Sequence, residues 1–115
     1  MTGLEAIKLT KLAPECVKVE LFTDEVDFHI RVWNWQIDYL KSFLSGSTSR
    51  IGFSECIFDV DQHYNDLDIY RIPNGICIYF SDYSNISDNF YRGVEVNESE
   101  GLAFVSQIIN LLETQ

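Results

Sequence analysis

The chain has 115 residues, 46% of them apolar and 14% aromatic, and its 8 Lys and Arg against 18 Asp and Glu give a formal net charge of −10. This apolar content is enough for a core, which excludes a wholly disordered chain, and the length is typical of one domain. Such a negative charge repels nucleic-acid phosphates and anionic membranes but attracts basic proteins. We therefore expect one domain over residues 1–115 that binds a basic protein, with no direct nucleic-acid binding and no membrane binding.

The N-terminal segments are mostly expected to form strands. Residues 4–12 fit either an edge strand or a short helix, and Pro14 ends both. Residues 17–23 alternate apolar and charged side chains, which is typical of a half-buried strand. Residues 26–35 continue the alternation after a polar turn, so these last two segments are expected to form a hairpin.

A short helix is expected next. Apolar side chains recur at helical spacing over residues 37–44, and the Ser-Gly-Ser sequence at 45–47 ends the helix. Residues 51–60 return to a strand pattern. Residues 61–66 are polar and are interpreted as a turn.

The strongest local signal is a hairpin over residues 67–80. Two apolar segments flank Pro73-Asn74-Gly75, and Asn-Gly supplies the positive φ that a tight hairpin turn uses. Residues 81–89 are interpreted as a polar, irregular loop, and residues 90–96 as a last strand.

The C-terminal segment, roughly residues 98–113, predicts the main helix. Asn97 with Glu100 three residues later resembles a capping box, with Ser99 as a rival cap. The apolar stripe contains Leu102, Val105, Ile108, Ile109 and Leu112. The sequence therefore predicts an α+β fold: a largely antiparallel sheet of five or six strands, one short inserted helix, and a C-terminal amphipathic helix packed on one face.

Carboxylates are concentrated in the segment that contains Asp59, Asp61, Asp66 and Asp68. A calcium loop is not indicated, because Tyr64 stands where the sharp turn needs glycine and the distal glutamate is missing. A solvated turn is the plain interpretation. The alternative is a cluster that recognises Lys and Arg side chains of a partner.

Two aromatic features are candidate contacts for the same partner. Trp33 and Trp35 share a strand face with charged residues, and tryptophan is favoured at binding hot spots. The alternative is that the C-terminal helix covers them as core residues. The polar loop adds Asp82, Tyr83 and Asp88 as adaptable contacts, unless it is an ordinary surface connection.

No pattern in the sequence indicates an enzyme, a cofactor or a metal site. Phosphate-binding loops, nucleophile elbows and zinc spacings are missing, and catalysis by His29 would need a nucleophile and a carboxylate that no motif supplies. Cys16, Cys56 and Cys77 lie far apart in sequence and are expected to be free thiols. With no signal-peptide pattern at the N-terminus, we expect a cytoplasmic protein.

The charge is uneven along the chain and suggests how a partner is bound. Residues 55–115 contain eleven of the acidic residues and only Arg71 and Arg92 as bases. We therefore expect a small inhibitory protein, an immunity protein or antitoxin that occludes the active site of a cognate basic, nuclease-type toxin. A phage-type nucleic-acid mimic, such as an anti-restriction or anti-CRISPR protein, and a small-molecule-binding α+β domain are the alternatives.

Overall fold

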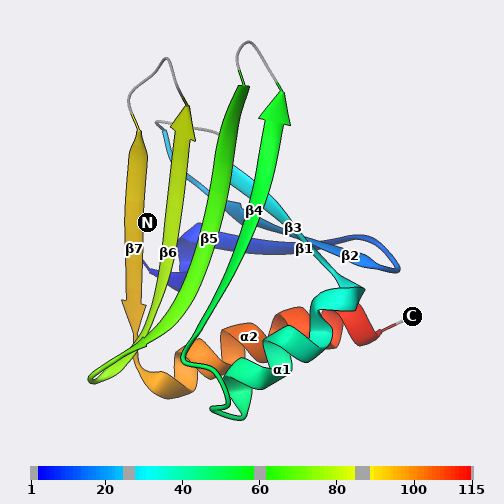
Figure 1. Ribbon diagram of the computed structural model, residues 1–115, viewed down its shortest axis with the longest axis vertical. Helices are drawn as coiled ribbons and strands as arrows, with labels where there is room; N and C mark the ends of the chain where they lie inside the picture. The colour runs from blue at the N-terminus through cyan, green and yellow to red at the C-terminus, as the bar shows by residue number, and fades with distance from the viewer. Residues whose placement is uncertain (1–2, 25–27, 59–61, 85–88, 115) are drawn as a thin grey trace.

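The computed structural model describes residues 3–24, 28–58, 62–84 and 89–114 (Figure 1). Within them the chain forms strands, two α-helices and two single 3₁₀ turns. The strands are β1 (Ile7–Ala13), β2 (Cys16–Leu21), β3 (Phe28–Trp33), β4 (Arg50–Phe58), β5 (Gln62–Ile72), β6 (Gly75–Ser84) and β7 (Phe90–Val96). The helices are α1 (Ile37–Leu44) and α2 (Glu98–Glu113), and the 3₁₀ turns are η1 (Leu4–Ala6) and η2 (Asn34–Gln36).

The described strands form two antiparallel sheets, in the order β1-β2-β3 and β4-β5-β6-β7. The expected α+β class and antiparallel pairing are confirmed, whereas one sheet of five or six strands is imprecise. The short helix α1 follows β3 and turns the chain away, so β4 starts a second sheet. In Figure 1 the sheet β4–β7 faces the viewer, the sheet β1–β3 crosses behind it, and both helices lie at one end.

The core lies between the two sheets and the helices. Alternate residues of each strand point inward, and Phe80 of β6 meets Phe28 of β3 edge to face, with ring centroids 5.0 Å apart. Helix α2 contacts β1, β2, β6 and α1. The fully buried side chains from both sheets include Val17, Val19, Ile30, Ile51, Leu67, Ile69, Ile76 and Ile78.

Both helices follow the sequence expectation. Helix α1 buries Leu40 and Phe43, and α2 buries one face that includes Val105 and Ile108. The Asn97 side chain accepts a hydrogen bond of 2.8 Å from the Glu100 N–H, so Asn97 is the N-cap of α2. No helix in the described part of the chain is long and apolar enough to cross a membrane.

The first strand is tied to the last helix. Residues 7–13 are a strand, which resolves the strand-or-helix ambiguity. The Lys11 ammonium donates to the carbonyl of Leu111, in the last turn of α2, at 2.8 Å and to that of Thr114, the residue that caps this helix. A cation at this end satisfies carbonyls that lack helical partners. This contact joins residues about a hundred positions apart in sequence.

Three sequence expectations are wrong in detail. Residues 62–66 belong to β5 rather than to a turn, and residues 81–84 belong to β6 rather than to a loop. The hairpin is confirmed, but Ile72 pairs with Gly75, so Pro73 and Asn74 form the turn. Positive φ is not used there: among the described residues it occurs only at Gly46.

Gly75 is required for a different reason: the backbone of Val96 approaches it closely. A Cβ atom at this position would lie 2.0 Å from the backbone oxygen of Val96. The start of β6 and the end of β7 are therefore packed against each other at backbone distance.

Candidate functional site

The outer face of the sheet β4–β7 is covered by neither helix (Figure 1). The strand register places tyrosines and aspartates on this face. Along β5, Leu67 and Ile69 point into the core, so the alternate residues point outward. Pairing with β4, β6 and β7 brings further side chains to the same face. We call this the tyrosine–aspartate face: Arg50, Tyr64, Asp66, Asp68, Tyr70, Tyr79, Tyr83 and Tyr91.

Four of the tyrosines form two stacked pairs across neighbouring strands. The ring centroids of Tyr64 and Tyr83 are 5.2 Å apart with 23° between planes, and those of Tyr79 and Tyr91 are 6.4 Å apart with 29° between planes. Tyr91 is 56% exposed and Tyr83 is 37% exposed. Stacked, solvent-facing tyrosines offer contact area at low entropic cost, which suits a protein-binding surface.

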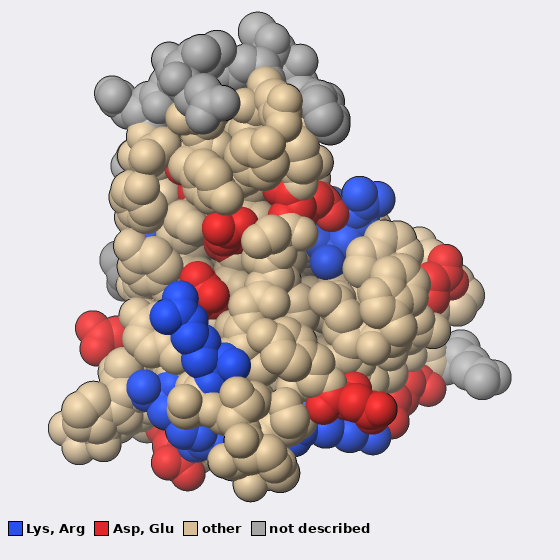
Figure 2. All heavy atoms as spheres, viewed as in Figure 1, with Lys and Arg blue, Asp and Glu red and all other residues tan. Residues whose placement is uncertain are grey.

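Asp68 is already paired with a basic side chain of the same face. The Arg50 guanidinium lies 3.3 Å from the Asp68 carboxylate and 5.5 Å from the centroid of the Tyr70 ring. A Cβ atom at Gly52 would lie 2.7 Å from Asp68 Oδ1, so the glycine leaves room for this carboxylate to lie over β4. Figure 2 shows that acidic and basic side chains lie near one another over this face.

Asp66 is not paired in this way. Its neighbours across the sheet are Ser54 on β4 and Ser81 on β6. Its Oδ1 atom is buried and accepts no hydrogen bond from the described residues. Burial, then the negative charge of Asp66 and a hydrogen bond with this carboxylate, raise the pKa of Tyr83. The Asp66 carboxylate is thus partly buried, and its hydrogen bonds to the described residues replace only part of its lost hydration.

Tyr70 stays neutral far above physiological pH. A hydrogen bond with the Cys77 thiol, then burial and the charges of neighbouring groups, raise the pKa of Tyr70 to about 12. The formal charge of the face near neutral pH therefore comes from its aspartates and Arg50.

Among the described residues predicted to bind a partner, three lie together on the tyrosine–aspartate face: Asp66, Asp68 and Tyr83. Their strands alternate in and out, which places all three on the tyrosine–aspartate face. Asp59, Asp61 and Asp88 lie outside the described residues.

The expected exposed position of Asp82 is wrong. Asp82 lies on β6, is only 5% exposed, and its carboxylate accepts a hydrogen bond from Asn65 Nδ2 at 2.9 Å. The same oxygen lies 2.7 Å from His63 Nδ1. The Asn65 side chain in turn accepts from the His29 backbone N–H at 3.2 Å, which links the two sheets. These bonds make Asp82 a structural residue.

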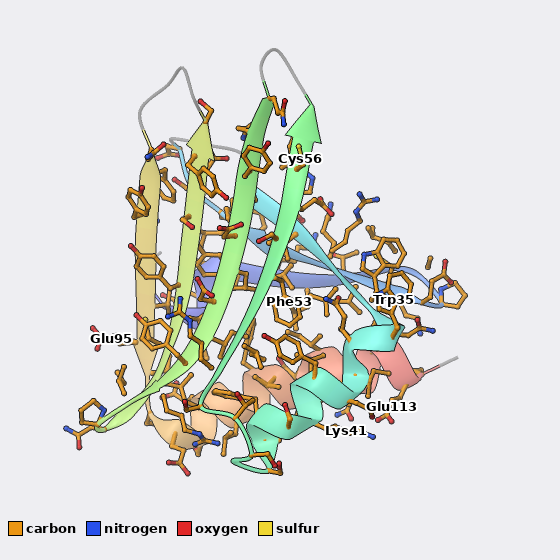
Figure 3. The ribbon with its side chains drawn as sticks, viewed as in Figure 1. Trp35, Lys41, Phe53, Cys56, Glu95 and Glu113 are labelled. Atoms are coloured by element: carbon orange, nitrogen blue, oxygen red, sulfur yellow. The ribbon has the colours of Figure 1, made fainter. Side chains whose placement is uncertain are left out.

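Trp33 and Trp35 lie on the other sheet and its following turn. Their rings stack 4.8 Å apart with 10° between planes, and the Arg31 guanidinium lies 5.6 Å from the centroid of the Trp33 ring. Trp35 is 70% exposed, so the interpretation of this residue as core is wrong. Figure 3 shows Trp35 on the side of the view opposite β7, which separates it from most of the tyrosine–aspartate face.

Tyr64, Tyr70, Tyr79, Tyr91 and Arg50 were missed as site residues. Tyr64 and Tyr70 share the two-residue period of Asp66 and Asp68, so reading residues 62–72 as one strand would have placed all four side chains on one face. Tyr79 has the same relation to Tyr83 on β6.

The prediction of three free thiols is confirmed. Cys16 and Cys77 are buried, while Cys56 is exposed on β4, and burial raises the pKa of the Cys16 thiol. We expect alkylation of the native protein to modify Cys56 first, and all three cysteines to react after unfolding. Mass spectrometry before and after denaturation measures this. Equal labelling rates at all three positions in the native protein would contradict the burial of Cys16 and Cys77.

No three His, Cys, Asp or Glu side chains within the described ranges are grouped so that they could hold a metal ion. No protein-family model matches the sequence, and neither the curated proteins nor the solved structures contain a match.

Proposed function

We propose that this protein is an inhibitory binding protein, an immunity protein or antitoxin, that covers the basic active site of a nuclease-type toxin. The observation that carries the proposal is the tyrosine–aspartate face, a broad sheet surface that neither α1 nor α2 covers. Nucleases hold phosphates with Lys and Arg, and an opposing surface of carboxylates and tyrosines is complementary to such a cleft.

The surface also has the composition of known kinds of protein-binding site. Tyrosine supplies rigid contact area, and charged groups at the margin accelerate encounter and are screened by salt. Glu95, which points outward from the edge strand β7 in Figure 3, adds negative charge beside the tyrosines.

Affinity capture followed by an activity assay tests the proposal. With the protein as bait in a lysate of its own cells, we expect a basic protein to be retained at low salt and less at 0.5 M salt. The purified captured protein should cleave nucleic acid, and a stoichiometric amount of the bait should stop the cleavage. Charge reversal by Asp66→Lys with Asp68→Lys should weaken capture by about tenfold or more, mainly through slower association.

A matched control changes the net charge equally elsewhere. Glu15 and Glu113 are exposed and lie outside the tyrosine–aspartate face. Glu15→Lys with Glu113→Lys should leave capture and inhibition within about threefold of wild type. The contradicting result is a captured enzyme that is inhibited equally well at low and high salt and by both wild type and the Asp66/Asp68 reversal variant. That result would show that this face is not the binding surface.

A further inference from the structure

Two neighbouring positions on the tyrosine–aspartate face are built alike, and a cation fills one of them. At the first, Arg50 lies over the Tyr70 ring and pairs with Asp68. At the second, two residues back along β5, Asp66 lies beside Tyr64 on its own strand and near Tyr83 on β6. Each position thus combines a carboxylate with a tyrosine ring.

The second position holds no cation from the described part of the chain. Among the ion pairs of the described residues, Asp68 is joined to Arg50, whereas Asp66 is joined to no basic side chain. The buried Asp66 Oδ1 also lacks a hydrogen bond from these residues. A buried acceptor without a donor is unfavourable, and native proteins contain few of them. Because no basic side chain of the described residues neutralises it, the charge of Asp66 can attract a cation from outside.

The tyrosines favour one kind of cation. The Tyr64 and Tyr83 rings are nearly parallel, and Tyr83 is exposed. A guanidinium is planar, weakly hydrated and able to stack on a ring while donating hydrogen bonds to a carboxylate, whereas an ammonium is strongly hydrated and cannot stack in this way. Arg50 shows this arrangement within the same sheet face.

We propose that Asp66, Tyr64 and Tyr83 form a receptor for an arginine side chain of the protein partner. The guanidinium stacks on the exposed Tyr83 ring and donates to Oδ2 of Asp66, because Oδ1 is buried. That the arginine belongs to a protein rests on the proposed function. The chemistry of the receptor, a carboxylate beside a stacked tyrosine pair, does not depend on it.

Short peptides test the receptor without the natural partner. The probes are an acetylated, amidated peptide with two arginines separated by glycine and its lysine counterpart, titrated into the isotope-labelled full chain and followed by NMR. We expect the arginine peptide to shift the ring resonances of Tyr64 and Tyr83 and to bind several-fold more tightly than the lysine peptide. Equal binding of the two peptides, or shifts confined to other parts of the surface, would overturn the proposal.

Two nearly isosteric variants separate this position from general attraction to negative charge. Asp66→Asn should weaken binding of the arginine peptide by about tenfold. Asp68→Asn removes the same charge next to Arg50 and should weaken binding of this peptide by less than about threefold. Equal losses in both variants would mean unspecific attraction. If Asp66→Asn alters resonances throughout the protein, Tyr83→Leu replaces it, with the same expected loss and the same contradicting outcome.

The natural partner separates this inference from the proposed function. If wild type inhibits the captured nuclease and Asp66→Asn inhibits it equally well, the arginine receptor is wrong while the inhibitory function stands. If the arginine peptide binds as expected but no captured protein is inhibited, the receptor stands and the function is wrong.

Discussion

Phe80→Ala is expected to lower the free energy of unfolding by about 3–5 kcal/mol, because it removes the ring that joins the two sheets. Phe80 lies near the middle of β6 and is fully buried. Its ring meets the ring of Phe28 in the other sheet with 87° between the ring planes. The smaller side chain leaves a cavity that two hydrogen-bonded sheets cannot close by a small movement. Equilibrium unfolding in guanidinium chloride measures the difference.

Tyr91→Ala is the matched control for Phe80→Ala. Tyr91 also belongs to the sheet β4–β7, but it points to solvent on the outer face. We expect a change within about 1 kcal/mol, from loss of the stacking contact with Tyr79. A comparable loss for both variants would show that the inner face of this sheet is not the core.

Gly75→Ala is expected to cost about 1–3 kcal/mol or more, although the change adds only a methyl group. The obstacle is the backbone oxygen of Val96, which lies where the methyl group would be placed and belongs to the end of β7. Backbone in a paired strand cannot move aside as a flexible side chain can. Thermal unfolding followed by circular dichroism should show a clearly lower midpoint.

The neighbouring Asn74→Ala serves as the comparison for Gly75→Ala. Asn74 is exposed in the turn and makes no strand pair. Its replacement should change the free energy of unfolding by about 0.5 kcal/mol or less. A Gly75→Ala protein as stable as wild type would mean that β6 and β7 are further apart at this point than the structure has them.

Local patterns in the sequence were sufficient to predict most of the elements. Helical spacing identified α1 and α2, and alternation identified β2 and β3. The start of β5 was missed because Asn65 is polar where an inward-facing strand residue is usually apolar. Its amide is satisfied by Asp82, which is 17 residues away, and no local pattern reveals such a partner.

The division into two sheets and the composition of the site depend on long-range pairing. Nothing in the residues around α1 shows that β3 and β4 are not paired. Asp66, Asp68 and Tyr83 were recognised as candidates by their chemistry, whereas the stacked tyrosines become visible only once the register between β5 and β6 is known. Asp82 was misplaced because its segment was interpreted as a loop.

The bond between Lys11 and the carbonyls at the C-terminal end of α2 has a consequence for the order of folding. During synthesis β1, β2 and β3 leave the ribosome before α2, the helix that covers part of their inner face. Contacts so distant in sequence close slowly, since loop entropy must be lost before they form. The part of the first sheet's apolar side that α2 covers therefore stays accessible to chaperones until α2 docks.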